Sequence, residues 1–183
     1  MSVTVTTLVS RINAYVMKFA AAIMIGFSLD LDTWTISSIM FENKLLHACA
    51  VNSVPEMVIN GGYSSDSTWT TDDGETFGIL PPMPLGLHDH CLVALDDDDL
   101  FVAGYHNYNP KTFLYHSDTM EWEQIRDMPD DAYAKACAMV HNSAGEQEVI
   151  VVDSEYTQIY NVQSGQWRFG RSNEISILSS SLI

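Results

Sequence analysis

Two histidines on either side of an aspartate come nearest to a chemically useful group in this sequence. His88, Asp89 and His90 offer two imidazoles and a carboxylate, which are side chains that bind metal ions. Alternate residues of a strand face the same side, so His88 and His90 could converge. No third ligand follows at a suitable spacing, and the segment leads into a predicted strand where a histidine can pack. We therefore expect no metal site here.

The other candidates for chemistry lack a second group at a useful spacing. His106 and His116 fall in a predicted loop and hairpin, and the sequence pairs neither with a serine or a cysteine. Cys49, Cys91 and Cys137 are an odd number without CxxC spacing, which favours small packing residues over a redox motif or a zinc site. The chain has no GxxxxGK phosphate loop and no GxSxG elbow. We expect no catalytic residue, no cofactor and no enzyme.

The composition is that of an acidic globular protein. Of 183 residues, 46% are hydrophobic and 17% are charged, and 24 acidic against 8 basic residues give a net charge of −16. Such a surface repels phosphate backbones and anionic membranes, so we expect no nucleic-acid partner. The apolar run at residues 19–27 is too short to span a membrane. The acidic run Asp96 to Asp99 could steer a basic protein, but a solvated turn is the favoured interpretation.

A repeat of about 45 residues organises the chain. Aromatic residues recur at spacings of 43, 45 and 45, and a residue suited to a turn stands four positions before each of them. The aromatic positions are Trp34, Phe77, Trp122 and Trp167, and the turn positions are Asp30, Asp73, Asp118 and Gln163. Such a fixed period predicts one supersecondary unit repeated along the chain.

Each period contains four short β segments separated by polar or glycine-containing turns. The first carries a cysteine, as in the strand around Cys91, and the last carries the aromatic residue, as with Trp122. This order is typical of an antiparallel meander. A single such sheet cannot bury both of its faces, so neighbouring sheets must stack to form the core.

These features resemble the kelch repeat. The resemblance rests on the double glycine Gly61–Gly62, on Tyr115 and Trp122 seven residues apart, and on the trailing Met128–Pro129, and it covers roughly residues 20–170. It implies an all-β, kelch-like β-propeller whose inter-strand loops bind other proteins. Two departures are Ala103 where the first glycine of the pair would recur and Phe77 in place of a tryptophan.

The repeat predicts about three complete four-stranded blades and parts of a fourth. Complete units fall near residues 46–80, 90–125 and 135–169, a half unit near 20–40, and a final strand at 174–183. Pairing that final strand with the half unit would close a ring of four blades. Because kelch propellers usually have more blades, we favour a partial or open propeller.

The first 19 residues lie outside the clear repeat. The spacing of their apolar residues favours a helix over residues 8–20, whereas the opening VTVTTLV is strand-like. Cysteine usage favours a cytoplasmic protein. The alternative is secretion, because Met17 followed by the apolar run 19–27 resembles a signal peptide.

The function we expect is that of a protein-binding scaffold or adaptor. Function on a repeat fold lies in the loops that differ between units, and those after Gly62 and Gly104 differ here. The expected partner-binding residues are Tyr63, Tyr105, His106, Asn107, Tyr108 and Asn109. Two alternatives stay open, namely a secreted propeller enzyme or a fragment of one, and a truncated propeller without independent function.

Overall fold

A computed structural model describes most of the chain, and it divides the chain into two compact units, Met1–His88 and Asp89–Ile183. The described residues are 4–6, 14–17, 23–28, 33–39, 48–53, 56–62, 65–72, 76–130, 136–152 and 156–170; before residue 48, the backbone alone is described. No helix among them is long and apolar enough to cross a membrane.

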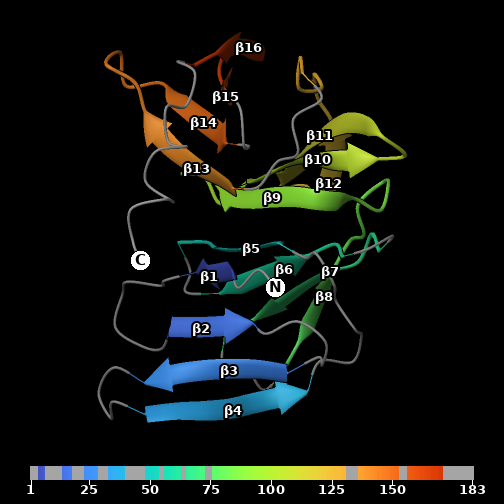
Figure 1. Cartoon of the computed structure of the whole chain (residues 1–183), viewed down its shortest axis with the longest axis vertical. Coiled ribbons are helices and arrows are strands. Elements are labelled where there is room, and N and C mark those ends of the chain that lie inside the picture. The colour runs from blue at the N-terminus through green and yellow to red at the C-terminus, as the bar shows by residue number, and fades with distance from the viewer. Residues whose placement is uncertain are drawn as a thin grey trace, which may run out of the picture. The chain divides into compact units, whose positions relative to one another are not determined.

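The first unit contains two sheets, each with its four strands in chain order (Figure 1). One consists of β1 (Thr4–Thr6), β2 (Ala14–Met17), β3 (Ile23–Ser28) and β4 (Thr33–Ile39). The other consists of β5 (Ala48–Val51), β6 (Met57–Asn60), β7 (Thr68–Thr71) and β8 (Gly78–Leu80). Hairpin connections join successive antiparallel strands, which is the predicted meander.

The second unit repeats this arrangement, in yellow-green and orange in Figure 1. Its first sheet consists of β9 (His88–Ala94), β10 (Leu100–His106), β11 (Asn109–His116) and β12 (Glu121–Gln124). Its second sheet consists of β13 (Ala136–His141), β14 (Gln147–Val152), β15 (Thr157–Asn161) and β16 (Gln166–Phe169). The prediction of an all-β chain built from four-stranded sheets is confirmed.

The aromatic residues occupy matching positions in the last two strands of three sheets. Trp34 is paired with Phe27, Trp122 with Tyr115 and Trp167 with Tyr160, each directly across an antiparallel ladder. In the remaining sheet, Phe77 precedes β8 and contacts Trp69, with the ring centroids 6.4 Å apart. Aromatic side chains opposite one another on one face stabilise a strand pair, so the repeat marks equivalent places in the fold.

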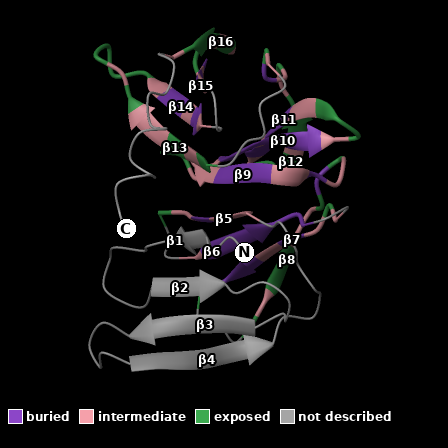
Figure 2. Cartoon of the chain, viewed as in Figure 1, coloured by how far each residue is buried: buried purple, intermediate pink, exposed green. Residues whose placement is uncertain are grey.

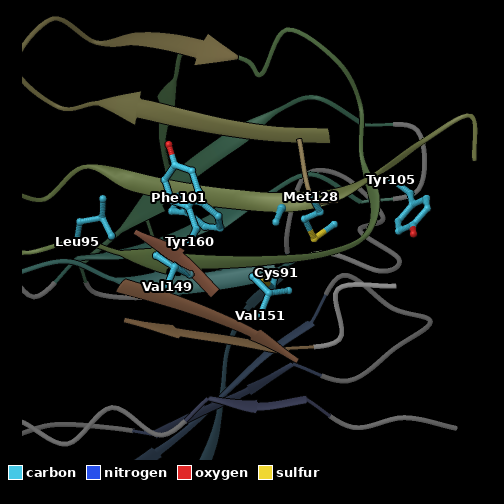
Figure 3. Packing of buried hydrophobic residues seen from close by; sticks show 9 residues of the cluster. Cys91, Leu95, Phe101, Tyr105, Met128, Val149, Val151 and Tyr160 are labelled. Atoms are coloured by element: carbon cyan, nitrogen blue, oxygen red, sulfur yellow. The ribbon is translucent and has the colours of Figure 1, made fainter. Parts of the chain in front are cut away.

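The core of the second unit lies between its two sheets (Figure 3). Phe101 of β10 is fully buried, and its ring lies 5.4 Å from that of Tyr160 and 6.1 Å from that of Trp167 in the neighbouring sheet. Val149 and Val151 of β14 complete the contact. Burying an aromatic or branched side chain contributes about 1.5–3 kcal/mol, so this layer joins the two sheets. Figure 2 shows β10 as the most continuously buried strand of this unit.

The sheet β5–β8 has its own smaller apolar cluster. Met57 and Ile59 are buried, and Cys49, Trp69 and Phe77 pack against them. Asn60, which is fully buried beside the cluster, donates a 2.7 Å hydrogen bond from Nδ2 to Thr68 Oγ1 on the next strand. This bond satisfies the buried amide nitrogen of Asn60, which would otherwise destabilise the sheet.

The N-terminal region differs from one expectation. The preference for a helix over residues 8–20 is wrong at Ala14–Met17, which form β2, and Thr4–Thr6 in the strand-like opening of the chain form β1. Val16 pairs with Ile25 of β3, so partners in the sheet override the helical spacing of the apolar residues. The run 19–27 that resembles a signal peptide overlaps β3.

The first sheet therefore has four strands of its own, and it does not need a C-terminal strand to complete it. The predicted final strand at 174–183 lies outside the described residues. The chain thus contains four full four-stranded sheets in its described part, where three and parts of a fourth were expected.

Candidate interaction site

The turn between β10 and β11 is a two-residue hairpin, much tighter than the loop that the sequence suggested. His106 pairs with Asn109, and the residues between them, Asn107 and Tyr108, have φ angles of 49° and 62°. Two successive left-handed residues define a type I′ turn, whose twist matches that of the flanking strands. Asn109 Nδ2 donates a 2.9 Å hydrogen bond to the carbonyl oxygen of Asn107, which holds the tip in this form.

Tyr108 is unusual at the second position of this turn. Glycine is preferred there because any residue with a Cβ atom is strained at positive φ. Asparagine, which occupies the first position, tolerates this conformation better than tyrosine does. The Tyr108 side chain is nevertheless 85% exposed. An exposed aromatic ring on a strained backbone is a feature that binding sites often share.

The structure separates the predicted partner-binding residues. Asn107, Tyr108 and Asn109 are exposed at the tip, and His106 is half-buried beside them. Tyr105 is wrong as a contact residue, because it is 3% exposed and belongs to the core between the two sheets (Figure 3). Alternation along β10 explains this, since Tyr105 shares the inward face with Phe101 and Ala103. Tyr63 lies outside the described residues.

His116 lies between two carboxylates at the opposite end of β10 and β11 from the Tyr108 turn. His116 Nδ1 lies 2.9 Å from Asp99 Oδ2, and its Nε2 lies 3.1 Å from Glu123 Oε2. The hydrogen bond with Glu123 is the largest cause of a raised His116 pKa; the hydrogen bond and charge of Asp99 add to it, and burial opposes it. The sequence predicted no role for His116, since only the fold brings these carboxylates together.

The acidic run at residues 96–99 is largely occupied with contacts inside the protein. Asp99 Oδ1 accepts a 2.8 Å hydrogen bond from the Ser117 backbone N–H, which caps the neighbouring turn. Asp96 Oδ2 lies 2.6 Å from His141 Nε2 in the other sheet, and the Asp96 backbone N–H donates to Gln147 Oε1 at 3.2 Å. Asp99 thus supports a turn in its own sheet, and Asp96 makes exposed contacts with the neighbouring sheet.

A disulfide joins Cys91 of β9 to Cys137 of β13, with Cα atoms 5.7 Å apart. The prediction that all three cysteines serve as equivalent packing residues is wrong for this pair. The aromatic positions Trp122 and Trp167 are 45 residues apart, whereas the two cysteines are 46 apart. Because side chains alternate between faces, this one-residue offset places the two cysteines on opposite faces of their sheets, where they meet between neighbouring sheets.

Comparison with known proteins supports the fold and nothing finer. No family model and no curated protein matches the chain. Among solved structures it is similar to a fungal alcohol oxidase of the AA5 family in complex with copper, with a TM-score of 0.61 and 9% identity. The match covers 83% of this chain and 35% of the oxidase, so the chain spans about a third of that protein's length.

This similarity overturns the expectation that the chain is not an enzyme. That expectation rested on missing catalytic motifs and on the repeat fold, and a similar fold occurs in an oxidase. Among the residues that the structure describes, no three His, Cys, Asp or Glu side chains come together in a way that could hold a metal ion. His90 is buried and His88 half-buried in β9 without such a group.

Proposed function

We propose that the four sheets are blades of a kelch-like β-propeller and that the β10–β11 turn presents Tyr108 to a protein partner. Three sheets share the same aromatic pairing, as between Tyr160 and Trp167, and two successive sheets stack through a common core. Repeated meanders that bury their faces against their neighbours are the building principle of propellers. A solved structure, the fungal oxidase, has a similar fold over 83% of this chain.

The observation that carries the binding role is the exposure of Tyr108, at 85%, in a turn position that favours glycine. Tyrosine supplies a large rigid contact area at a low cost in side-chain entropy, which is why it is enriched at protein interfaces. The polar side chains of Asn107 and Asn109 flank it and can hydrogen-bond a partner's backbone.

The disulfide supports a secreted protein over a cytoplasmic one. Cys91 and Cys137 are joined in a folded sheet pair, and such bonds persist in oxidising compartments and are rare in the cytosol. This part of the proposal predicts that the bond is intact in protein recovered from the medium of cells that make it.

Site-specific photo-crosslinking tests the binding role. Replacing Tyr108 by the aromatic photo-crosslinker benzoylphenylalanine should yield a protein adduct from secreted and cell-surface proteins of the source cells. Excess unmodified chain should compete for the adduct, and the Tyr108→Gly variant should not. The matched control carries the crosslinker at Met120, which is also exposed and at positive φ in a hairpin turn of the same sheet. Identical adducts from both positions, or none from Tyr108, would refute the proposal.

A second candidate follows from the fold similarity alone, namely that these sheets form part of a longer propeller oxidase. It requires a metal site, and the described residues hold no group of three His, Cys, Asp or Glu side chains that could form one. Metal analysis of the purified chain after copper loading and desalting distinguishes the candidates. About one bound copper per chain would favour the enzyme, and a copper-free chain that still crosslinks through position 108 would favour the binding module.

A further inference from the structure

The two sheets of the second unit meet through one apolar layer and through polar contacts, of which Arg126 with Gln166 and Asp96 with His141 join exposed side chains. Trp167 Nε1 donates a 2.7 Å hydrogen bond to the Arg126 carbonyl oxygen, and the Asp130 backbone N–H donates to Gln158 Oε1 at 3.3 Å. Asp96 and His141 are paired, but both side chains are 48% exposed. Water can compete for such exposed partners, so this pair adds little to the contact between the sheets.

The Cys91–Cys137 disulfide is the covalent link across this layer. Cys91 is 5% exposed and lies in the same cluster as Phe101, while Cys137 is half-buried beside its cross-strand neighbour Val151. The bond closes a loop that contains all of β10, β11 and β12. A crosslink over a loop of this length removes many conformations from the unfolded and the partly opened chain.

We propose that this disulfide is a redox-controlled clamp: when it is oxidised it holds the sheet β13–β16 on the sheet β9–β12, and when it is reduced it lets β13–β16 open as a unit. The proposal goes beyond partner binding at Tyr108 and does not depend on it. It concerns how stably one sheet packs on its neighbour. Hydrogen exchange of backbone amides measures the free energy of such local opening.

The chemistry is thiol–disulfide exchange with a dithiol. One thiolate of the dithiol attacks Sγ of Cys137, the more accessible sulfur, and a mixed disulfide forms as the Cys91 thiolate leaves and takes up a proton. The second thiol of the reagent then attacks the mixed disulfide and releases the Cys137 thiol. The protein disulfide gains two electrons and two protons, and the dithiol becomes a cyclic disulfide.

Hydrogen exchange on the complete chain tests the clamp, with dithiothreitol as the dithiol. Amides of β14, including those of Val149 and Val151, lie at the centre of sheet β13–β16 and report its opening. Their exchange should accelerate about a hundredfold on reduction, the size expected from loss of a typical disulfide. Equal rates before and after complete reduction would overturn the proposal, as would peptide mapping under non-reducing conditions that finds no Cys91–Cys137 linkage.

Two variants separate the clamp from a general effect of reductant. The Cys91→Ala/Cys137→Ala double variant should exchange rapidly at β14 without dithiothreitol and should not respond to it. The Cys49→Ala variant should retain the full response of the parent chain, because Cys49 lies in β5 of the first unit. Should the double variant fail to fold, the comparison of oxidised and reduced parent chain decides alone. A response that persists in the double variant, or is lost in Cys49→Ala, contradicts the proposal.

Discussion

Tyr108 combines two features that do not favour stability. Its backbone has a φ of 62°, where a side chain strains the chain, and its ring is 85% exposed, where it gains little from burial. Asn107, beside it, also has positive φ, but the short polar side chain of asparagine tolerates that conformation. The hairpin would therefore be more stable with glycine at position 108.

We predict that Tyr108→Gly raises the free energy of unfolding by about 1 kcal/mol, because it relieves left-handed strain. Urea titration followed by circular dichroism measures this, and Tyr108→Ala, which keeps a Cβ atom, is the control and should change stability less. The same glycine variant should lose crosslinking to a partner. A glycine variant less stable than the parent would contradict the assignment of strain to this residue.

His116 gives the protein a pH-dependent contact. Its pKa is raised above the ordinary 6.5, first by the hydrogen bond with Glu123 and then by Asp99. A raised pKa in the folded state means that the stabilisation is fully present below about pH 6.5 and is lost as the pH rises through the folded pKa. The contact is therefore stronger in mildly acidic solution.

We predict that the difference in melting temperature between the parent chain and His116→Gln is larger at pH 5.5 than at pH 8.5. The change should be small because the His116 side chain is 32% exposed and solvent screens the contact. NMR titration of the His116 ring should give a pKa above 6.5. The pair formed by His141 and Asp96 is common to both proteins and cancels in the comparison. A difference that is equal at both pH values would contradict the prediction.

At the scale of elements, the last hairpin turns of the two sheets in the second unit have the same geometry and different residues. The Met120 N–H donates to the His116 carbonyl at 2.8 Å, and the Gly165 N–H donates to the Asn161 carbonyl at 2.9 Å. Their φ angles are 58° and 65°. Glycine adopts this conformation without strain and methionine does not, so one turn carries a cost that the other avoids.

We predict changes of opposite sign at these two positions. Met120→Gly should stabilise the chain by about 1 kcal/mol, and Gly165→Ala should destabilise it by about the same amount. A Cβ atom at Gly165 would lie 3.7 Å from the Tyr160 hydroxyl, an ordinary contact, so the cost comes from the backbone alone. Denaturant midpoints of both variants provide the test, and changes of the same sign would show that the two turns are not equivalent.

At the scale of the whole second unit, stability depends on the layer between its sheets. Phe101 reaches across this layer to Tyr160 and Trp167, whereas Phe169 at the end of β16 is 56% exposed. We predict that Phe101→Ala lowers the free energy of unfolding by about 3–5 kcal/mol. Phe169→Ala removes the same atoms from an exposed site and should change it by only about 0.5 kcal/mol. Calorimetric melting of the two variants measures the difference, and similar losses would place the core elsewhere.

The repeat in the sequence predicted the strands, because the residues that define each strand and turn lie close together along the chain. The spacing of Trp122 and Trp167 located two equivalent hairpins, and the structure pairs Tyr115, seven residues earlier, directly with Trp122. At Ala14–Met17, the same method failed because the partner strand β3, rather than the spacing of nearby apolar residues, decided the conformation. Tyr105 was misplaced because the turn proved to contain two residues, which leaves Tyr105 inside a strand.

The sequence by itself determined the repeat, the four-stranded unit and the polarity of the surface, since these depend on residue order and composition. Only the tertiary structure decided that Cys91 and Cys137 meet, that Asp99 and Glu123 contact His116, and that Tyr108 is exposed at the tip of a two-residue turn. Each of these depends on which face of a strand meets which neighbour. A shift of one residue in the register moves a side chain to the other face of its sheet. The packing of whole sheets decides that register, and local periodicity does not.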